Sequence, residues 1–242
     1  MCKPAVTWSV KAIIFWLLIY AIFSPYVLSK FSLHTILYLK QTFGFSIDNH
    51  SMSFLKTFFH IFVETCMNLF LVCFILKRKQ VSFRDIGIQL KIRFRTCSGL
   101  IIAGALFNTI VFLFLKHYEM ITVTPASQVI EQSYWPFTLG VSLITLGLLT
   151  PFNEEVIFRG ILFQSLRNQI SVIPAIAISA LIFGLMHVNS INSWVHFAAV
   201  ILMGCITCII FFRTGSLTNA CIFHASGNST GIVLGYIFYV WN

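Results

Sequence analysis

The sequence predicts an all-α membrane protein, a polytopic bundle of about seven transmembrane helices (six to eight) with short interfacial helices. Hydrophobic residues make up 58% of the 242 positions and charged residues only 10%, whereas a soluble domain carries about 25% charged residues. The apolar residues gather in runs that approach the roughly 20 residues a helix needs to cross a bilayer. We expect the whole chain, residues 1–242, to form a single membrane domain.

Three spans are expected in the first half of the chain, at residues 12–28, 54–76 and 98–115. The first is too long for the apolar core of a signal peptide and no small-residue cleavage site follows it. The second and third are joined by a basic connection, residues 77–97, which holds seven Lys and Arg residues. Its middle is expected to form a short amphipathic element on the membrane surface.

The second half contains four more apolar runs, at residues 137–150, 171–187, 194–212 and 217–240. With a cytoplasmic N-terminus, 12 of the 16 Lys and Arg residues fall on the inner side, as the positive-inside rule requires. The sequence therefore predicts a multi-pass cell-membrane protein. The net charge of +9 indicates contact with lipid headgroups rather than nucleic acid.

An acidic pair interrupts the apolar sequence at Glu154 and Glu155, with Arg159 following. Ionisable side chains at membrane depth are costly and usually functional. Glu155 and Arg159 are spaced i, i+4 and can pair along one face of a helix. Glu154 is rotated by about 100° from Glu155 and is expected to face elsewhere. A purely structural ion pair between helices is the alternative for Glu155 and Arg159.

Two later segments supply polar partners for this pair. His187 ends the span 171–187, and His224 and Asn228 are spaced i, i+4 in the last span. From the rise of about 1.5 Å per residue, all of them fall roughly 10 to 24 Å from the cytoplasmic face. Carboxylates, imidazoles and an amide at one depth are suited to activating water. Taken singly, His187 could be interfacial, and His224 with Asn228 could be an interhelical hydrogen bond.

Two other groups of polar residues carry less weight. His60, Glu64 and Asn68 form a stripe at i, i+4 and i+8 in the second span, for which we expect a structural or cavity-lining role. His196 is expected at the membrane interface. The seven cysteines show no disulfide spacing.

The three motifs together resemble one known family. GluGluXXXArg at 154–159, PheXXXHis at 183–187 and HisXXXAsn at 224–228 are similar to the motifs of the CPBP family, the CAAX proteases and bacteriocin-processing enzymes also called Abi. The resemblance covers about residues 137–232, the expected catalytic core. It implies an intramembrane endopeptidase whose helical bundle surrounds a cavity open to the cytosol.

The resemblance also implies a role for each motif residue. Glu154 would be the general base and His187 would hold the attacking water. Glu155 with Arg159 would support the site, and His224 with Asn228 would stabilise the oxyanion. A tuned carboxylate can serve as the base, and fixed donors can stabilise a tetrahedral intermediate.

No cofactor is expected to be required, so the enzyme would be glutamate-dependent. The alternative is a metalloendopeptidase with zinc or another divalent ion on Glu154, His187 and His224, since three protein ligands and water suit catalytic zinc. The expected partners are membrane lipid and a peptide or lipidated-protein substrate. Maturation of a bacteriocin or pheromone, or self-immunity, is the expected context.

Three other functions stay open at the level of the sequence. The first is a CAAX-type prenyl-protein protease. The second is a non-catalytic bacteriocin-immunity protein, in which Glu154→Gln would leave protection intact. The third is an ion-coupled transporter, since intramembrane Glu and His also build proton relays. A transporter predicts inverted repeats and broken helices, and the sequence shows no internal repeat.

Overall fold

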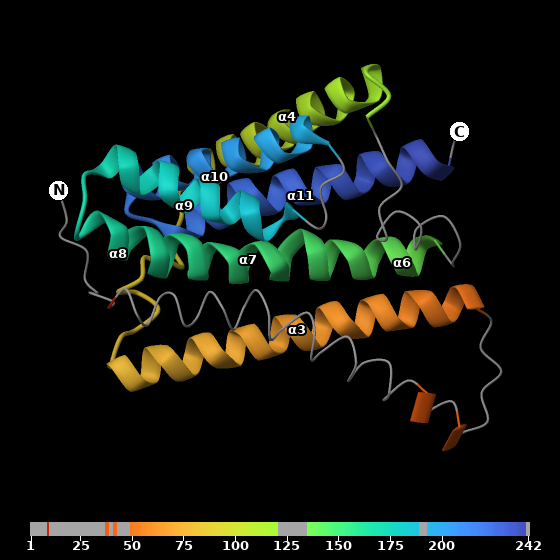
Figure 1. The fold of residues 1–242 in the computed structure, drawn as a ribbon, viewed down its shortest axis with the longest axis horizontal. Coiled ribbons are helices and arrows are strands. Elements are labelled where there is room, and N and C mark those ends of the chain that lie inside the picture. Colours follow the sequence, from red (N-terminus) through yellow and green to blue (C-terminus); the bar gives the residue numbers. More distant parts are fainter. Residues whose placement is uncertain are drawn as a thin grey trace.

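The computed structural model describes residues 9, 37–38, 41–42, 49–120, 135–188 and 193–240. Every regular element among them is helical (Figure 1), which confirms the all-α class. Three of these helical stretches are long and apolar enough to cross a membrane, Phe94–His117, Leu139–Arg167 and Trp194–Thr214, and Val172–Met186 is a shorter apolar helix. The expected span at 12–28 lies outside the described residues, and the predicted number of seven spans is not confirmed.

Helices α3 and α4 form the described part of the first half. Helix α3, Asn49–Lys79, has 31 residues and ends in the basic residues that begin the 77–97 connection. Helix α4, Phe94–His117, has 24 residues. Helix α3 includes the span predicted at 54–76, and α4 includes the span predicted at 98–115. They do not run side by side as a hairpin: α4 packs most extensively against α11, and α3 contacts η2 and α7.

The connection between α3 and α4 forms turns, so the prediction of an amphipathic surface element there was wrong. The reason is Ile86, whose side chain is 0% exposed and belongs to the main core. Backbone bonds hold the segment to the start of α11, because Leu217 N–H donates to the carbonyl of Gly87 at 2.7 Å. Gly87 has φ +94°, a conformation that glycine adopts without steric cost.

One side chain of this connection also fixes its turn. Asp85 accepts hydrogen bonds from the hydroxyl and the backbone N–H of Ser82, both at 2.7 Å. These bonds, with a smaller contribution from nearby Arg84, hold the pKa of Asp85 below its ordinary value. The turn is therefore organised around an ionised carboxylate.

A continuous helix from Trp135 to Arg167 carries the acidic pair. It consists of α6 (Trp135–Ser142), η2 (Leu143–Leu149), α7 (Thr150–Glu155), η3 (Val156–Phe163) and α8 (Gln164–Arg167). The apolar run at 137–150 therefore continues into the acidic stretch within one helix. The two segments η2 and η3 are π-helical, a form that is rare and often found at functional sites. They flank α7 on both sides.

Helices α9 (Val172–Met186), α10 (Trp194–Thr214) and α11 (Leu217–Val240) complete the described fold. Helix α10 ends at Gly215, which has φ +63°, and α11 begins two residues later. Small residues let these helices approach closely. A Cβ atom on Gly184 would lie 2.6 Å from the side chain of Ile201. The absence of a side chain at this position therefore lets α9 and α10 pack closely, as is common in membrane bundles.

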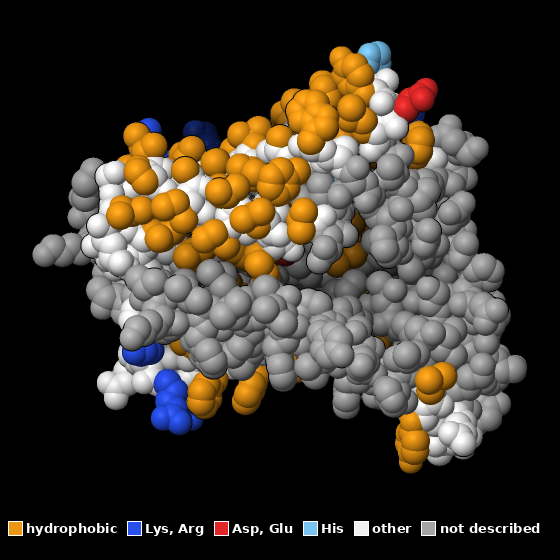
Figure 2. All heavy atoms as spheres, in the orientation of Figure 1, with side chains coloured by type: hydrophobic (Ala, Val, Ile, Leu, Met, Phe, Trp, Pro, Cys, Tyr) orange, Lys and Arg blue, Asp and Glu red, His pale blue; other side chains and the backbone are white. Residues whose placement is uncertain are grey.

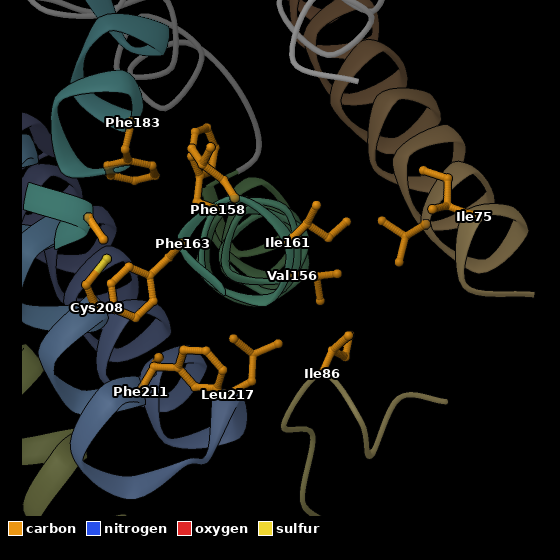
Figure 3. Close-up of a cluster of buried hydrophobic side chains, with 14 of the residues drawn as sticks. Ile75, Ile86, Val156, Phe158, Ile161, Phe163, Phe183, Cys208, Phe211 and Leu217 are labelled. Atoms are coloured by element: carbon orange, nitrogen blue, oxygen red, sulfur yellow. The ribbon is translucent and has the colours of Figure 1, made fainter. Parts of the chain in front are cut away.

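The buried core surrounds η3 (Figure 3). Phe158 and Phe163 point toward α9 and α10, while Val156 and Ile161 point toward α3. Ile86 and Leu217 close the core below η3. On the outside, exposed hydrophobic side chains lie along α4, α9 and α10, and Figure 2 shows such side chains over much of one face. This distribution suits a lipid environment, where the exterior is as apolar as the core.

Candidate active site

The structure brings the acidic pair and both motif histidines into contact. Glu154 extends from α7 toward two imidazoles on other helices. Its Oε1 lies 3.4 Å from His187 Nε2, and its Oε2 lies 3.6 Å from His224 Nε2. The Glu154 side chain is 6% exposed and that of His224 is 4% exposed. Three segments that are far apart in the sequence, α7, the end of α9 and α11, therefore meet at one carboxylate.

Glu155 lies behind His224 and pairs with Arg159. His224 Nδ1 is 2.8 Å from Glu155 Oε1, and the same oxygen is 3.0 Å from Arg159 Nη1. The i, i+4 pairing expected from the spacing is thus present. Arg159 Nη2 also donates to the carbonyl of Gly204 on α10 at 3.2 Å. Both Glu155 and Arg159 are 0% exposed, so this pair is a buried support beneath the imidazole.

The ring of Phe183 joins these groups from α9. Arg159 Cζ lies 4.5 Å from the centre of that ring, within the range of a cation–π interaction. The same ring lies 4.5 Å from the His187 ring and 5.8 Å from the His224 ring, centre to centre. Phe183 and His187 belong to the same sequence motif, and their rings are in contact. Phe183 therefore fixes the relative positions of the guanidinium and both imidazoles.

The hydrogen-bond partners of the imidazoles determine which nitrogen carries the proton. His187 Nδ1 is 2.8 Å from the carbonyl oxygen of Phe183, and His224 Nδ1 faces the Glu155 carboxylate. Both partners accept hydrogen bonds, so we assign a proton to Nδ1 in each ring. In the neutral form of each ring, Nε2 then carries a lone pair directed at Glu154. With both rings neutral, the Glu154 carboxylate and the two Nε2 atoms all accept hydrogen bonds, and none of them donates one.

A cavity of about 170 Å³ lies beside this cluster. Both motif histidines and Asn228 line it, together with apolar side chains of α4 and α10. His196 also lines it, and the interfacial position expected for this residue stays a prediction. Its place follows from the start of α10 at Trp194, which turns residue 196 toward the site.

Asn228 makes a contact that spacing did not indicate. Its amide nitrogen donates to the carbonyl oxygen of Leu146 in η2 at 3.2 Å. An amide nitrogen has two hydrogens, so one remains for another acceptor. The expected pairing of Asn228 with an oxyanion stays a prediction.

Two further polar residues outside the motifs are buried. Asn153, beside Glu154, donates to the carbonyl of Thr65 on α3 at 3.1 Å. Asn68, from the predicted polar stripe, is 5% exposed, while the side chains of His60 and Glu64 lie outside the described residues. The sequence offered one indication that Asn153 belongs to the site, which is its amide side chain directly before the acidic pair.

The fit of the site to a metal ion can be judged from its donors. Two Nε2 lone pairs and a carboxylate are chemically suitable ligands. Within the part of the chain that the structure describes, however, no group of three or more His, Cys, Asp and Glu side chains has the arrangement of a metal site. The donor chemistry suits a divalent ion, and the expectation that no cofactor is required stays a prediction.

Comparisons with known proteins point to one family. Residues 133–230 match the model of the Rce1-like family, described as type II CAAX prenyl endopeptidase Rce1-like. The chain is also 28% identical over 97 residues to an Escherichia coli protein described as an uncharacterized 24.3 kDa protein. That match spans 39% of this chain and 44% of the relative, which is less than half of either. No solved structure gives a significant match.

The matched range contains all seven motif residues and nearly coincides with the 137–232 core expected from the sequence. Together with the apolar helices, it identifies a multi-pass membrane protein. Residues 133–230 are therefore similar to the Rce1-like type II CAAX prenyl endopeptidases, which agrees with the resemblance to the CPBP and CAAX protease family carried by the three motifs.

Proposed function

We propose that the protein is an intramembrane endopeptidase that hydrolyses a peptide bond with water activated by Glu154. One observation carries this proposal: the carboxylate of Glu154 lies between two imidazole Nε2 atoms, at 3.4 and 3.6 Å. Both separations exceed a direct hydrogen bond of about 2.7–3.2 Å. When both imidazoles are neutral, all three groups accept, and a water molecule that donates two hydrogens is then a fitting partner for them.

The reaction follows from these positions. Glu154 takes a proton from water as the water oxygen forms a bond to the carbonyl carbon of the substrate. The carbon–nitrogen bond then breaks, and the proton on Glu154 passes to the leaving amine. The products are a carboxylic acid and an amine, and Glu154 returns to its ionised form. A positioned base of this kind contributes about 10²- to 10⁴-fold to the rate.

The remaining residues have supporting roles in this proposal. His187, fixed by the carbonyl of Phe183, holds the attacking water. His224, fixed by Glu155, is a donor to the oxyanion when its Nε2 carries a proton. Arg159 holds the Glu155 carboxylate in place through the 3.0 Å pair. The catalytic carboxylate and the structural carboxylate are thus adjacent in sequence but different in role.

We further propose that the reaction needs no metal ion. The two oxygens of Glu154 and the Nε2 atoms of His187 and His224 are spaced to suit a hydrogen-bonded water. If a divalent ion were nevertheless resident, these three side chains would be the ligands to test.

The proposed substrate is a membrane-associated or lipidated peptide. Glu154 is buried within a helix that is long enough to cross a bilayer, so the scissile bond must reach membrane depth. A lipid anchor on the substrate would bring it there. The family is described by its action on prenylated CAAX proteins; maturation of a bacteriocin or pheromone, or self-immunity, is the context we propose for this chain.

The test uses purified protein in lipid nanodiscs and three forms of one apolar peptide: prenylated, acylated and unmodified. We expect mass spectrometry to detect cleavage of a lipidated form by wild type and none by Glu154→Gln. Glu119→Gln is the matched control, because Glu119 is an exposed carboxylate at the end of α4. Cleavage of no form by wild type would refute the protease, and retained biological protection by Glu154→Gln would favour a non-catalytic immunity protein.

A further inference from the structure

The helix η2 contains a backbone carbonyl that its own helix cannot satisfy in the observed register. The N–H of Thr150 donates to the carbonyl of Thr145, five residues earlier, which is the π-helical pattern. The next bond in that pattern would run from residue 151 to Leu146. Residue 151 is proline, which has no N–H. The π-helix must therefore end here, with the Leu146 carbonyl left without its donor.

Asn228 supplies the missing donor from a different helix. Its amide nitrogen lies 3.2 Å from the Leu146 carbonyl oxygen, across 82 residues of sequence. The close approach of η2 and α11 makes this contact possible, because a Cβ on Gly147 would lie 2.7 Å from Ser229 Oγ. A side chain at residue 147 would separate the two helices at the point where the amide reaches across.

The alternative register shows why this contact matters to the site. In an α-helix, Thr150 N–H would bond to Leu146, four residues earlier. Asn228 already donates to that carbonyl, so the π register leaves it satisfied and the change to an α-helix gains less from the Thr150 bond. Moving the register by one residue turns the following helix by about 100°. Glu154 lies eight residues after Leu146, so such a turn would direct its carboxylate away from His187 and His224.

We infer that Asn228 is a positioning residue: by donating to the carbonyl that Pro151 leaves unpaired, it holds η2 in its π-helical register and fixes the direction of Glu154. This role differs from direct stabilisation of an oxyanion. Its structural part is independent of any reaction, whereas its effect on cleavage rests on the proposed function.

Pro151→Ala separates the two roles. An alanine at residue 151 has an N–H that can reach Leu146 within the π-helix, so Asn228 becomes dispensable for holding the register. An oxyanion donor would be needed equally in both backgrounds. The experiment therefore compares wild type, Asn228→Ala, Pro151→Ala and the double variant. Asn108→Ala, an amide that lines the same cavity, is the matched control in each background.

The first measurement is the unfolding equilibrium in detergent, which requires no activity. We expect Asn228→Ala to raise the unfolding constant on the order of 3- to 20-fold, the range of interhelical hydrogen bonds in membrane proteins. In the Pro151→Ala background the effect should fall to within about twofold, the scatter between independent sites. An equal effect in both backgrounds would overturn the link to Leu146. If Asn228→Ala alone fails to fold, recovery in the double variant supports the link and failure of both contradicts it.

The second measurement is the cleavage rate with a lipidated peptide. We expect Pro151→Ala to restore much of the activity that Asn228→Ala loses, and to leave the effect of Asn108→Ala unchanged. An equal loss in both backgrounds would assign Asn228 to the reacting groups and refute the positioning role. If wild type cleaves no substrate, the proposed function fails while the stability comparison still decides the contact with Leu146.

Discussion

Replacing Arg159 with alanine removes the only guanidinium that contacts the buried acidic pair among the described residues. Arg159 is 0% exposed and lies 3.0 Å from Glu155, which is equally buried. The same side chain donates to the Gly204 carbonyl and lies over the Phe183 ring. Without it, Glu155 keeps only His224 Nδ1 as a partner, and one carboxylate oxygen is already unpaired.

The expected cost follows from that loss. Breaking a buried ion pair by removing one partner destabilises a protein by about 3–5 kcal/mol, because the other charge remains buried. Arg159→Ala should therefore lower the stability by that amount as well as reduce cleavage. Glu154→Ala removes a carboxylate that has no arginine partner, and it should abolish cleavage with a much smaller change in stability.

Unfolding in detergent, followed by tryptophan fluorescence or circular dichroism, measures both effects. Arg213→Ala is the control, since this arginine is exposed at the end of α10 and surface changes stay within about 0.5 kcal/mol. Equal stability losses for Arg159→Ala and Glu154→Ala would refute the division of the acidic pair into a catalytic and a supporting carboxylate.

Three further predictions concern the fold and the chemistry. Ile86→Ala should destabilise the protein by about 2–5 kcal/mol, because this side chain is 0% exposed, whereas Leu90→Ala at a 98% exposed position should be neutral in the same unfolding assay. Removing divalent ions with a chelator should leave the cleavage rate unchanged; a loss that one added metal restores would contradict water activation without a metal. The lowered pKa of Asp85 means that its stabilisation of the turn is present above its ordinary pKa and disappears as the pH falls through the lowered one. The protection of the Ser82 amide against hydrogen exchange, taken relative to the intrinsic exchange rate at each pH, should therefore fall at acidic pH, and Asp85→Asn should remove that dependence.

Local spacing predicted the part of the site that lies within single helices. The i, i+4 rule placed Arg159 beside Glu155 and directed Glu154 elsewhere. The length of the apolar run placed His187 at the end of its helix, where the structure has it as the residue that closes α9. These relations depend only on helix geometry, which the hydrophobic pattern reveals.

Contacts between backbone and distant side chains could not be predicted in this way. The π-helical segments η2 and η3 leave no periodic signal in a sequence that is apolar on all sides. Gly204 takes part through its carbonyl, so its side chain gives no indication. Ile86 looked like part of a surface element, because its burial depends on α11 and η3, which follow much later in the chain.

The central claim is that Glu154 is the base that activates water, and single-turnover cleavage by Glu154→Gln tests it most directly. The substitution preserves the shape of the side chain but removes its capacity to take a proton. The account predicts a rate lower by about 10²-fold or more, with the unfolding midpoint unchanged from that of wild type. The account would be contradicted by a Glu154→Gln protein that is equally stable and cleaves within about tenfold of the wild-type rate. Loss of the base should lower the rate by more than that.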